Sequence, residues 1–187
     1  MFSKTWGNTE GPVSTFSQQS GSYESITTEW DFPERMVNSY GVQPNDRRHQ
    51  FKIFGSYGIT RELTVGANLY AASGTPRMCR GGFGPDQVAL HGSHTYYFCG
   101  GVPVPPGSLG RLPWTTRLDL SLDYKPTLKY VDNGLDFNVA VFNVFNHQTP
   151  LFINDFFGTT SSPNSEYGNV ENFTPPRSVR LSVAYDF

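Results

Sequence analysis

The chain has 187 residues and a formal net charge of −2, from 14 Lys and Arg against 16 Asp and Glu. Its length suits one domain, and the near-neutral charge argues against nucleic acid as a partner, because phosphate binding requires a basic surface. No apolar run approaches the roughly 18 residues that a membrane-spanning helix needs. Membrane strands are apolar only at every second position, so composition does not exclude them.

The chain begins with a short apolar run and a long polar stretch. Residues 1–6 include Phe, Thr and Trp and fit the end of a strand. Residues 7–49 are rich in Ser, Thr, Asn and Gly, and they exceed the usual connection within a compact domain, so we expect a long outer loop. The first residues have neither the apolar core nor the cleavage site of a signal peptide. We therefore expect that the chain is not exported or that it is the tail of a longer protein.

Two segments with alternating apolar residues follow the first loop. Residues 50–59 and 62–72 each place apolar side chains at every second position, as a strand with one apolar face does. The turn around Arg61 is short, which predicts an antiparallel hairpin.

The second half of the chain repeats this arrangement. Residues 73–113 are irregular, with Gly and Pro as breakers. Residues 114–125 and 135–146 alternate again, and the weaker pattern at 142–145 indicates a bulge. Residues 147–176 form a third long loop.

The last segment, 177–187, alternates most clearly. Its apolar face consists of Val179, Leu181, Val183, Tyr185 and Phe187. The connections between strands run long, short, long, medium and long, which is typical of a membrane barrel with extended outer loops and short periplasmic turns. Aromatic residues near strand ends fit the membrane–water boundary, and we expect this role for Trp114, Tyr124 and Tyr185.

Charged residues avoid the apolar rows throughout the predicted strands. A basic side chain on the lipid face at mid-membrane would cost roughly 2–4 kcal/mol. A soluble sandwich would also alternate, so the asymmetry of the loops decides in favour of a barrel. We expect these charges to line its lumen: Arg117, Asp119, Asp123, Lys125, Arg180 and Asp186.

The number of strands indicates that the barrel is incomplete. The chain supplies about five strands and a stub, whereas the smallest single-chain barrels have about eight strands. An open sheet leaves unpaired backbone groups in lipid. We therefore expect an all-β antiparallel meander of five to six strands, the C-terminal segment of a transmembrane β-barrel with long extracellular loops.

Several segments resemble TonB-dependent outer-membrane receptors. The segment 141–146 (VFNVFN) resembles their penultimate-strand motif, and 177–187 resembles their last strand. The segments 107–114 (GSLGRLPW) and 72–76 (ASGTP) are similar to the Oar-like branch of this family. The resemblance covers essentially the whole chain, 1–187, but only the C-terminal part of such a receptor.

The resemblance implies a 22-stranded barrel with an N-terminal plug, which imports a substrate across the bacterial outer membrane with energy transduced by TonB. The implied partners are outer-membrane lipid, the rest of the receptor chain, TonB through the N-terminal part, and the barrel-assembly machinery. The barrel-assembly machinery would recognise the apolar face of the closing strand, which includes Phe187. The plug and the TonB-contacting segment have no counterpart here, so we expect no transport by this chain alone. No enzymatic activity, cofactor or metal is expected.

Cys79 and Cys99 lie in one long loop. Exported proteins pass through an oxidising compartment, so a disulfide is the leading interpretation. His91 and His94 lie between them and raise the alternative of a zinc site, but a Cys-x-x-Cys pair is missing. Two free cysteines are the remaining alternative.

Other functions remain open at this point. Asp119 and Asp123 share a face but lie about 13 Å apart along a strand, too far for most paired-carboxylate chemistry. An outer-membrane adhesion or structural protein, binding surfaces through its long loops, is the alternative to a receptor. A soluble secreted β-sandwich is a third.

Overall fold

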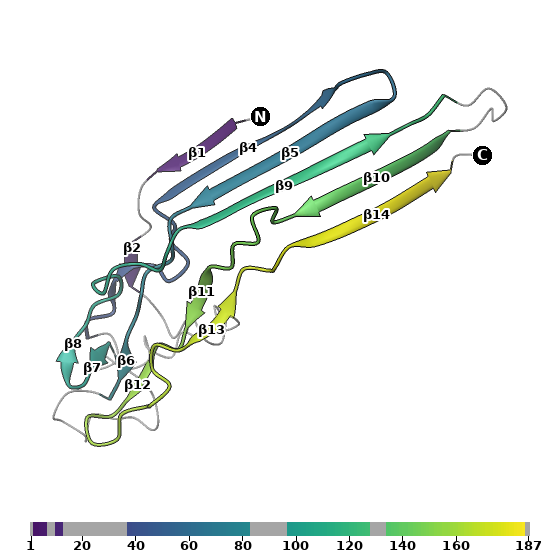
Figure 1. Ribbon diagram of the computed structural model, residues 1–187. Coiled ribbons are helices and arrows are strands. Elements are labelled where there is room, and N and C mark those ends of the chain that lie inside the picture. Colours follow the sequence, from purple (N-terminus) through teal and green to yellow (C-terminus); the bar gives the residue numbers. More distant parts are fainter. Residues whose placement is uncertain (1, 7–9, 13–36, 83–96, 128–133, 186–187) are drawn as a thin grey trace.

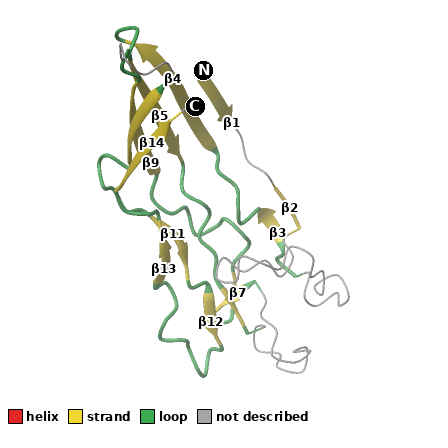
Figure 2. Ribbon diagram, turned by 90° about the vertical axis from the view of Figure 1, so that its right-hand side faces the viewer, coloured by secondary structure: helices red, strands yellow, loops and turns green. Residues whose placement is uncertain are grey.

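The computed structural model describes residues 2–6, 10–12, 37–82, 97–127 and 134–185. Every regular element in these ranges is a β-strand (Figure 2). None of the described segments forms a helix of the length and apolarity needed to span a membrane.

The main sheet has six strands in the order β1-β4-β5-β9-β10-β14, and neighbouring strands are antiparallel (Figure 1). Its strands are β1 (Phe2–Trp6), β4 (His49–Gly58), β5 (Leu63–Ala72), β9 (Thr115–Tyr124), β10 (Leu135–Phe142) and β14 (Ser178–Tyr185). The all-β antiparallel meander expected from the sequence is thus confirmed.

The strand register aligns apolar residues with apolar residues across the sheet. One transverse row runs through Tyr57, Val65, Leu122, Val139 and Leu181. The next row runs through Gly58, Thr64, Asp123, Asn138 and Ser182. Side chains of adjacent rows point to opposite faces, so one face of the sheet is apolar and the other is polar. β1 pairs with β4 in a register that runs from Phe2 opposite Ile53 to Trp6 opposite His49.

β10 ends at Phe142, four residues earlier than the alternation of 135–146 indicated. Asn143 and Asn146 have positive φ angles of 51° and 52°, a left-handed conformation that a strand cannot contain. Val144 N–H still donates to the Leu118 carbonyl of β9 at 2.8 Å. The weakened pattern at 142–145 therefore marks a tight asparagine turn against the neighbouring strand.

The two ends of the sheet differ in their connections. Residues 59–62 and 125–134 join strands at one end, whereas the three long connections all emerge at the other (Figure 1). We call the described residues 10–12, 37–48, 73–82, 97–114 and 143–177 at this second end the loop assembly. It contains short strand pairs: β2 (Glu10–Pro12) with β3 (Tyr40–Val42), β7 (Phe98–Cys99) with β8 (Val102–Pro103), β11 (Pro150–Ile153) with β13 (Val170–Phe173), and β6 (Arg80–Gly81) with β12 (Phe156–Gly158). The β6–β12 pair is parallel.

The buried core lies mainly in the loop assembly. Its largest fully buried side chains include Tyr97, Met78 and Asp155. In the main sheet, by contrast, every residue of β14 is exposed, and no second layer among the described elements covers either face (Figure 2). Buried side chains therefore lie mainly in the connections, whereas both faces of the sheet are uncovered, which is the reverse of most globular proteins.

The segments 72–76 and 107–114 pack against each other at the entrance to the loop assembly. Leu112 N–H donates to the Thr75 carbonyl at 2.9 Å, and Arg77 N–H donates to the Gly110 carbonyl at 2.8 Å. A Cβ atom at Gly74 would lie 1.9 Å from the Leu112 carbonyl oxygen. A glycine is therefore needed where these two limbs of one loop approach.

We predict that Gly74→Ala destabilises the loop assembly by about 1–3 kcal/mol, because the added methyl forces two backbone segments apart. Thermal unfolding in detergent micelles and hydrogen exchange of the Leu112 amide measure the effect. Gly55→Ala is the matched control, because its Cβ has no neighbour within 4 Å. Equal stability of the two variants would contradict the role of Gly74.

Candidate functional site

The apolar face of the main sheet is open over five adjacent strands. Leu181, at the centre of β14, is 73% exposed. The other exposed apolar residues of this face include Ile53, Tyr57, Leu120, Leu122, Tyr124, Phe137, Val139, Val179, Val183 and Tyr185. Monomeric soluble proteins rarely expose a contiguous apolar patch of more than a few hundred Å², so this face needs a non-aqueous neighbour.

Aromatic side chains mark both ends of the apolar face. At the loop end, Trp114 stacks on His49 with ring centroids 6.0 Å apart. At the turn end, Tyr124 stacks on Phe137 with centroids 6.5 Å apart, and Tyr185 pairs with Leu135. Ten residues of strand separate Trp114 from Tyr124, or about 33 Å at about 3.3 Å per residue. A tilt of about 40° reduces this to about 25 Å, the height of the apolar band of a membrane barrel.

The polar face carries the charged residues in close pairs. Arg117 Nε lies 2.7 Å from Asp119 Oδ1, and Lys125 Nζ lies 3.0 Å from Asp136 Oδ2. Asp123 accepts a hydrogen bond from Asn138 at 2.6 Å. The described residues expected to line the lumen thus share one face, and Arg117, Asp119 and Lys125 each pair with an opposite charge there. Asp186 lies outside the described residues, as does Phe187.

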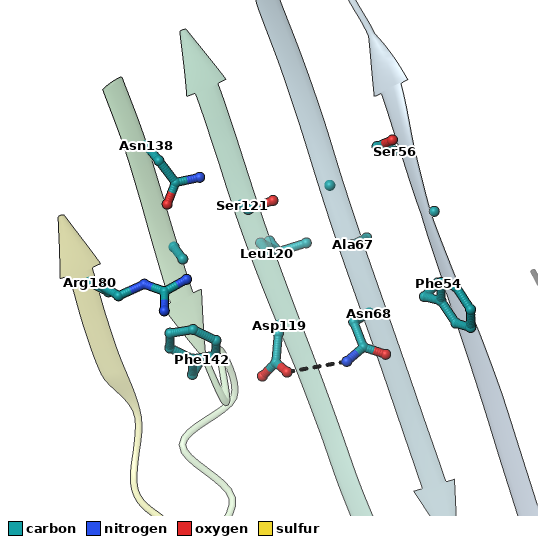
Figure 3. Close-up of a pocket in the computed structure, with 13 residues that line it drawn as sticks. Phe54, Ser56, Ala67, Asn68, Asp119, Leu120, Ser121, Asn138, Phe142 and Arg180 are labelled. Carbon is teal, nitrogen blue, oxygen red and sulfur yellow. Dashed lines mark hydrogen bonds between the residues drawn. The ribbon is translucent and has the colours of Figure 1, made fainter. Parts of the chain in front are cut away.

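A hollow of about 620 Å³ lies on the polar face between β4 and β14 (Figure 3). Phe54 and Phe142 stand at its opposite sides, and Arg180 reaches from β14 toward Phe142 (Figure 3). Small residues line the hollow between these aromatic rings: Gly55, Ser56, Gly66, Ala67, Ser121 and Ala140. The hollow is open because the polar-face positions Ser56, Gly66, Ser121 and Ala140 carry short side chains or none, whereas Gly55 and Ala67 belong to a row of the apolar face.

The asparagine turn after β10 joins the hollow to the loop assembly. Buried Asn143 donates from Nδ2 to the carbonyls of Pro175 at 2.8 Å and His147 at 3.2 Å, and its Oδ1 accepts from His147 N–H at 3.2 Å. Asn146 Oδ1 accepts from Arg177 N–H at 2.9 Å. The two asparagines of the VFNVFN motif therefore fix where the chain leaves β10 and where it enters β14.

The loop assembly is held by buried polar contacts between different loops. Arg80 pairs with Asp155 through two hydrogen bonds of 3.2 and 3.3 Å, and the Asp155 side chain is 0% exposed. Cys79 forms a disulfide with Cys99, with Cα atoms 5.6 Å apart. Arg111 pairs with the buried side chain of Asp46 in the first loop. All three loops thus share one interior.

The zinc alternative for the cysteine loop involves His91 and His94, which lie outside the described residues. In the part of the chain that is described, no group of three or more His, Cys, Asp or Glu is arranged to hold a metal ion.

Sequence reasoning did not find Arg80, Asp155, Phe142 or Asn143 as structural centres. The asparagine at the end of an alternating run was an available signal, because Asn tolerates the left-handed conformation and bonds locally. No sequence signal pairs Arg80 with Asp155, since 75 residues separate them.

At the turn end, Glu62 connects the two short turns. Its carbonyl accepts from Lys125 N–H at 2.7 Å, and its carboxylate accepts from Thr127 N–H at 2.8 Å. The hydrogen bonds from Thr127 to the charged form lower the pKa of the exposed Glu62 carboxyl from its ordinary value of 4.5.

The faces and connections of the main sheet indicate the class of protein to which the chain is similar. An antiparallel sheet with one exposed apolar face, one polar face and long connections at a single end is the architecture of a transmembrane barrel wall. The described strands are consistent with a segment of such a wall, and they do not close into a barrel.

Comparison with known proteins gives a narrower indication. The chain is similar to the TonB-dependent transporter Oar of Myxococcus xanthus, with 30% identity over 230 aligned residues. The match includes 100% of this chain and 20% of the relative, so the chain spans about a fifth of the relative's length. No protein-family model matches the chain, and no solved structure matches it significantly. The similarity supports a relationship to TonB-dependent receptors.

We predict that Asn143→Ala destabilises the protein by about 2–4 kcal/mol, because it removes several hydrogen bonds worth about 1 kcal/mol each and strains a left-handed position. Asn143→Gly removes the same hydrogen bonds without the strain, so it falls between Asn143→Ala and the parent. Denaturant unfolding in detergent micelles measures the order. Equal losses for the two variants would show that the left-handed backbone contributes nothing.

We predict that the Thr127 amide resonance follows the titration of Glu62 with a midpoint below 4.5. Because the pKa is lowered by folding, this contact stabilises the turns above the ordinary pKa and is lost as the pH falls through the folded-state value. NMR in micelles records the shift. Glu62→Gln is the control and removes the titration, whereas an unchanged Thr127 titration in that variant would contradict the assignment.

Proposed function

We propose that the chain forms the C-terminal part of the barrel wall of a TonB-dependent receptor in the bacterial outer membrane. The observation that carries the proposal is the open apolar face, which is continuous in register across five strands. Lipid chains are the neighbour that removes this surface from water without a second protein layer.

The orientation follows from the connections. In bacterial barrels the long loops face outward and the short turns face the periplasm, so the loop assembly would lie at the cell surface. β1 and β14 each pair on one side in the described sheet, and lipid does not tolerate unpaired strand edges. Further strands from the same receptor would therefore complete the barrel.

The whole receptor would bind a substrate and import it with energy transduced by TonB. Its partners would be outer-membrane lipid, the plug and remaining strands, TonB, and the barrel-assembly machinery at the closing strand. The polar face would line the lumen, where Arg117, Asp119, Asp123, Lys125 and Arg180 meet water. The similarity to the transporter Oar supports this interpretation.

We predict that Leu181→Arg reduces the stability of the full-length gene product in lipid bilayers by about 2–4 kcal/mol, because a guanidinium on the lipid face is costly near the midplane. Reconstitution into lipid vesicles, followed by the heat-dependent gel mobility of the folded fraction, measures the loss.

The matched control is Ser182→Arg, one residue further along β14 and on the polar face. It places the same charge at nearly the same depth but toward water, so folding remains at the parent level. If both variants fold equally well, the apolar face does not contact lipid and the proposal fails.

A further inference from the structure

We propose that the hollow on the polar face is a binding site for an anionic solute with a planar apolar ring, such as an aromatic carboxylate or phosphate. Arg180 would bind the anion, and Phe142 would contact the ring. The inference goes beyond the proposed function, because it assigns a ligand class to the polar face of this segment.

The charges beside Phe142 favour an anion. The guanidinium groups of Arg117 and Arg180 lie 5.7 and 5.4 Å from the centroid of its ring. Asp119 is the carboxylate that lines the hollow, so two cations face one anion. Beside Phe142 itself the imbalance is one positive charge, and Asp123, which accepts from the lining Asn138, lies further along β9.

Asp119 is already engaged by its neighbours and does not neutralise Arg180. It pairs with Arg117 at 2.7 Å, and it accepts hydrogen bonds from Asn143 N–H at 2.9 Å and Asn68 Nδ2 at 3.5 Å (Figure 3). Among the described residues, Arg180 has no carboxylate within ion-pair distance. Its planar group of donors suits a two-pronged contact with a carboxylate or phosphate.

The shape of the hollow suits a flat ring. The floor of the hollow carries short side chains, and the Ser121 hydroxyl partly covers Gly66, since a Cβ atom there would lie 2.4 Å from Ser121 Oγ. Phe54 is 46% exposed although it stands on the polar face, between the polar Lys52 and Ser56. Phe54 lies four strands from Arg180, so Phe142 is the ring that offers stacking and cation–π contact beside an arginine.

The test uses the full-length gene product in detergent micelles with benzoate as the probe, monitored by NMR chemical shifts and calorimetry. We expect saturable binding that falls by about tenfold in Arg180→Gln, since a charge-assisted contact is lost. Arg180→Lys retains part of the affinity, because it keeps the charge but not the planar donors. Benzylamine, with the opposite charge, does not compete.

Two further variants separate the ring from the charge. Phe142→Leu weakens benzoate more than acetate, because only benzoate uses the ring. Lys52→Gln is the matched control, since Lys52 is a cation of the same face that lies over Tyr70 and does not line the hollow. It leaves benzoate affinity unchanged.

The proposal is overturned if benzoate binding does not saturate, or if Arg180→Gln and Lys52→Gln weaken it equally. This outcome is distinguishable from failure of the proposed function. The Leu181→Arg and Ser182→Arg pair reports on lipid contact at the opposite face, whereas Arg180→Gln is expected to fold into vesicles at the parent level.

Discussion

The structure depends on the antiparallel register that brings apolar residues of neighbouring strands into shared rows. Because side chains alternate, a slip of one residue between β9 and β10 would move a whole strand's apolar residues to the polar face. It would also turn charges such as Asp123 toward lipid. Hydrocarbon on one side and water on the other therefore select one register, and the pairing of Leu122 with Val139 and of Asp123 with Asn138 is the result.

The loop assembly is stabilised by other interactions than the main sheet. It lies outside the apolar band and folds around its own interior, in which buried polar groups need partners. Arg80 of the second loop pairs with Asp155 of the third, and Arg111, also of the second loop, pairs with Asp46 of the first. Such pairs contribute more to one specific arrangement than to net stability, because desolvation offsets much of their attraction. The disulfide between Cys79 and Cys99 adds a covalent constraint beside Arg80.

The asparagine turn couples these two parts. Asn143 is buried where the ladder of β10 ends, and its side chain holds both the outgoing chain at His147 and the returning chain at Pro175. Its backbone N–H also bonds to Asp119, which lies on the polar face. One residue thus connects the strand end, the loop assembly and the charged cluster beside Phe142.

The sequence by itself determined the strands of the main sheet, their apolar and polar faces, and the ends at which the long loops lie. These features follow from local alternation, for which neighbouring residues suffice. Only the tertiary structure decided the end of β10, which depends on the left-handed conformation of Asn143. It also decided the fold of the loops, where β6 and β12 pair in parallel across a long stretch of chain. The hollow likewise unites Phe54, Phe142 and Arg180 from three strands. Contacts within and between the loops depend on loop closure and on the partners of single side chains, and alternation along a strand carries no information about either.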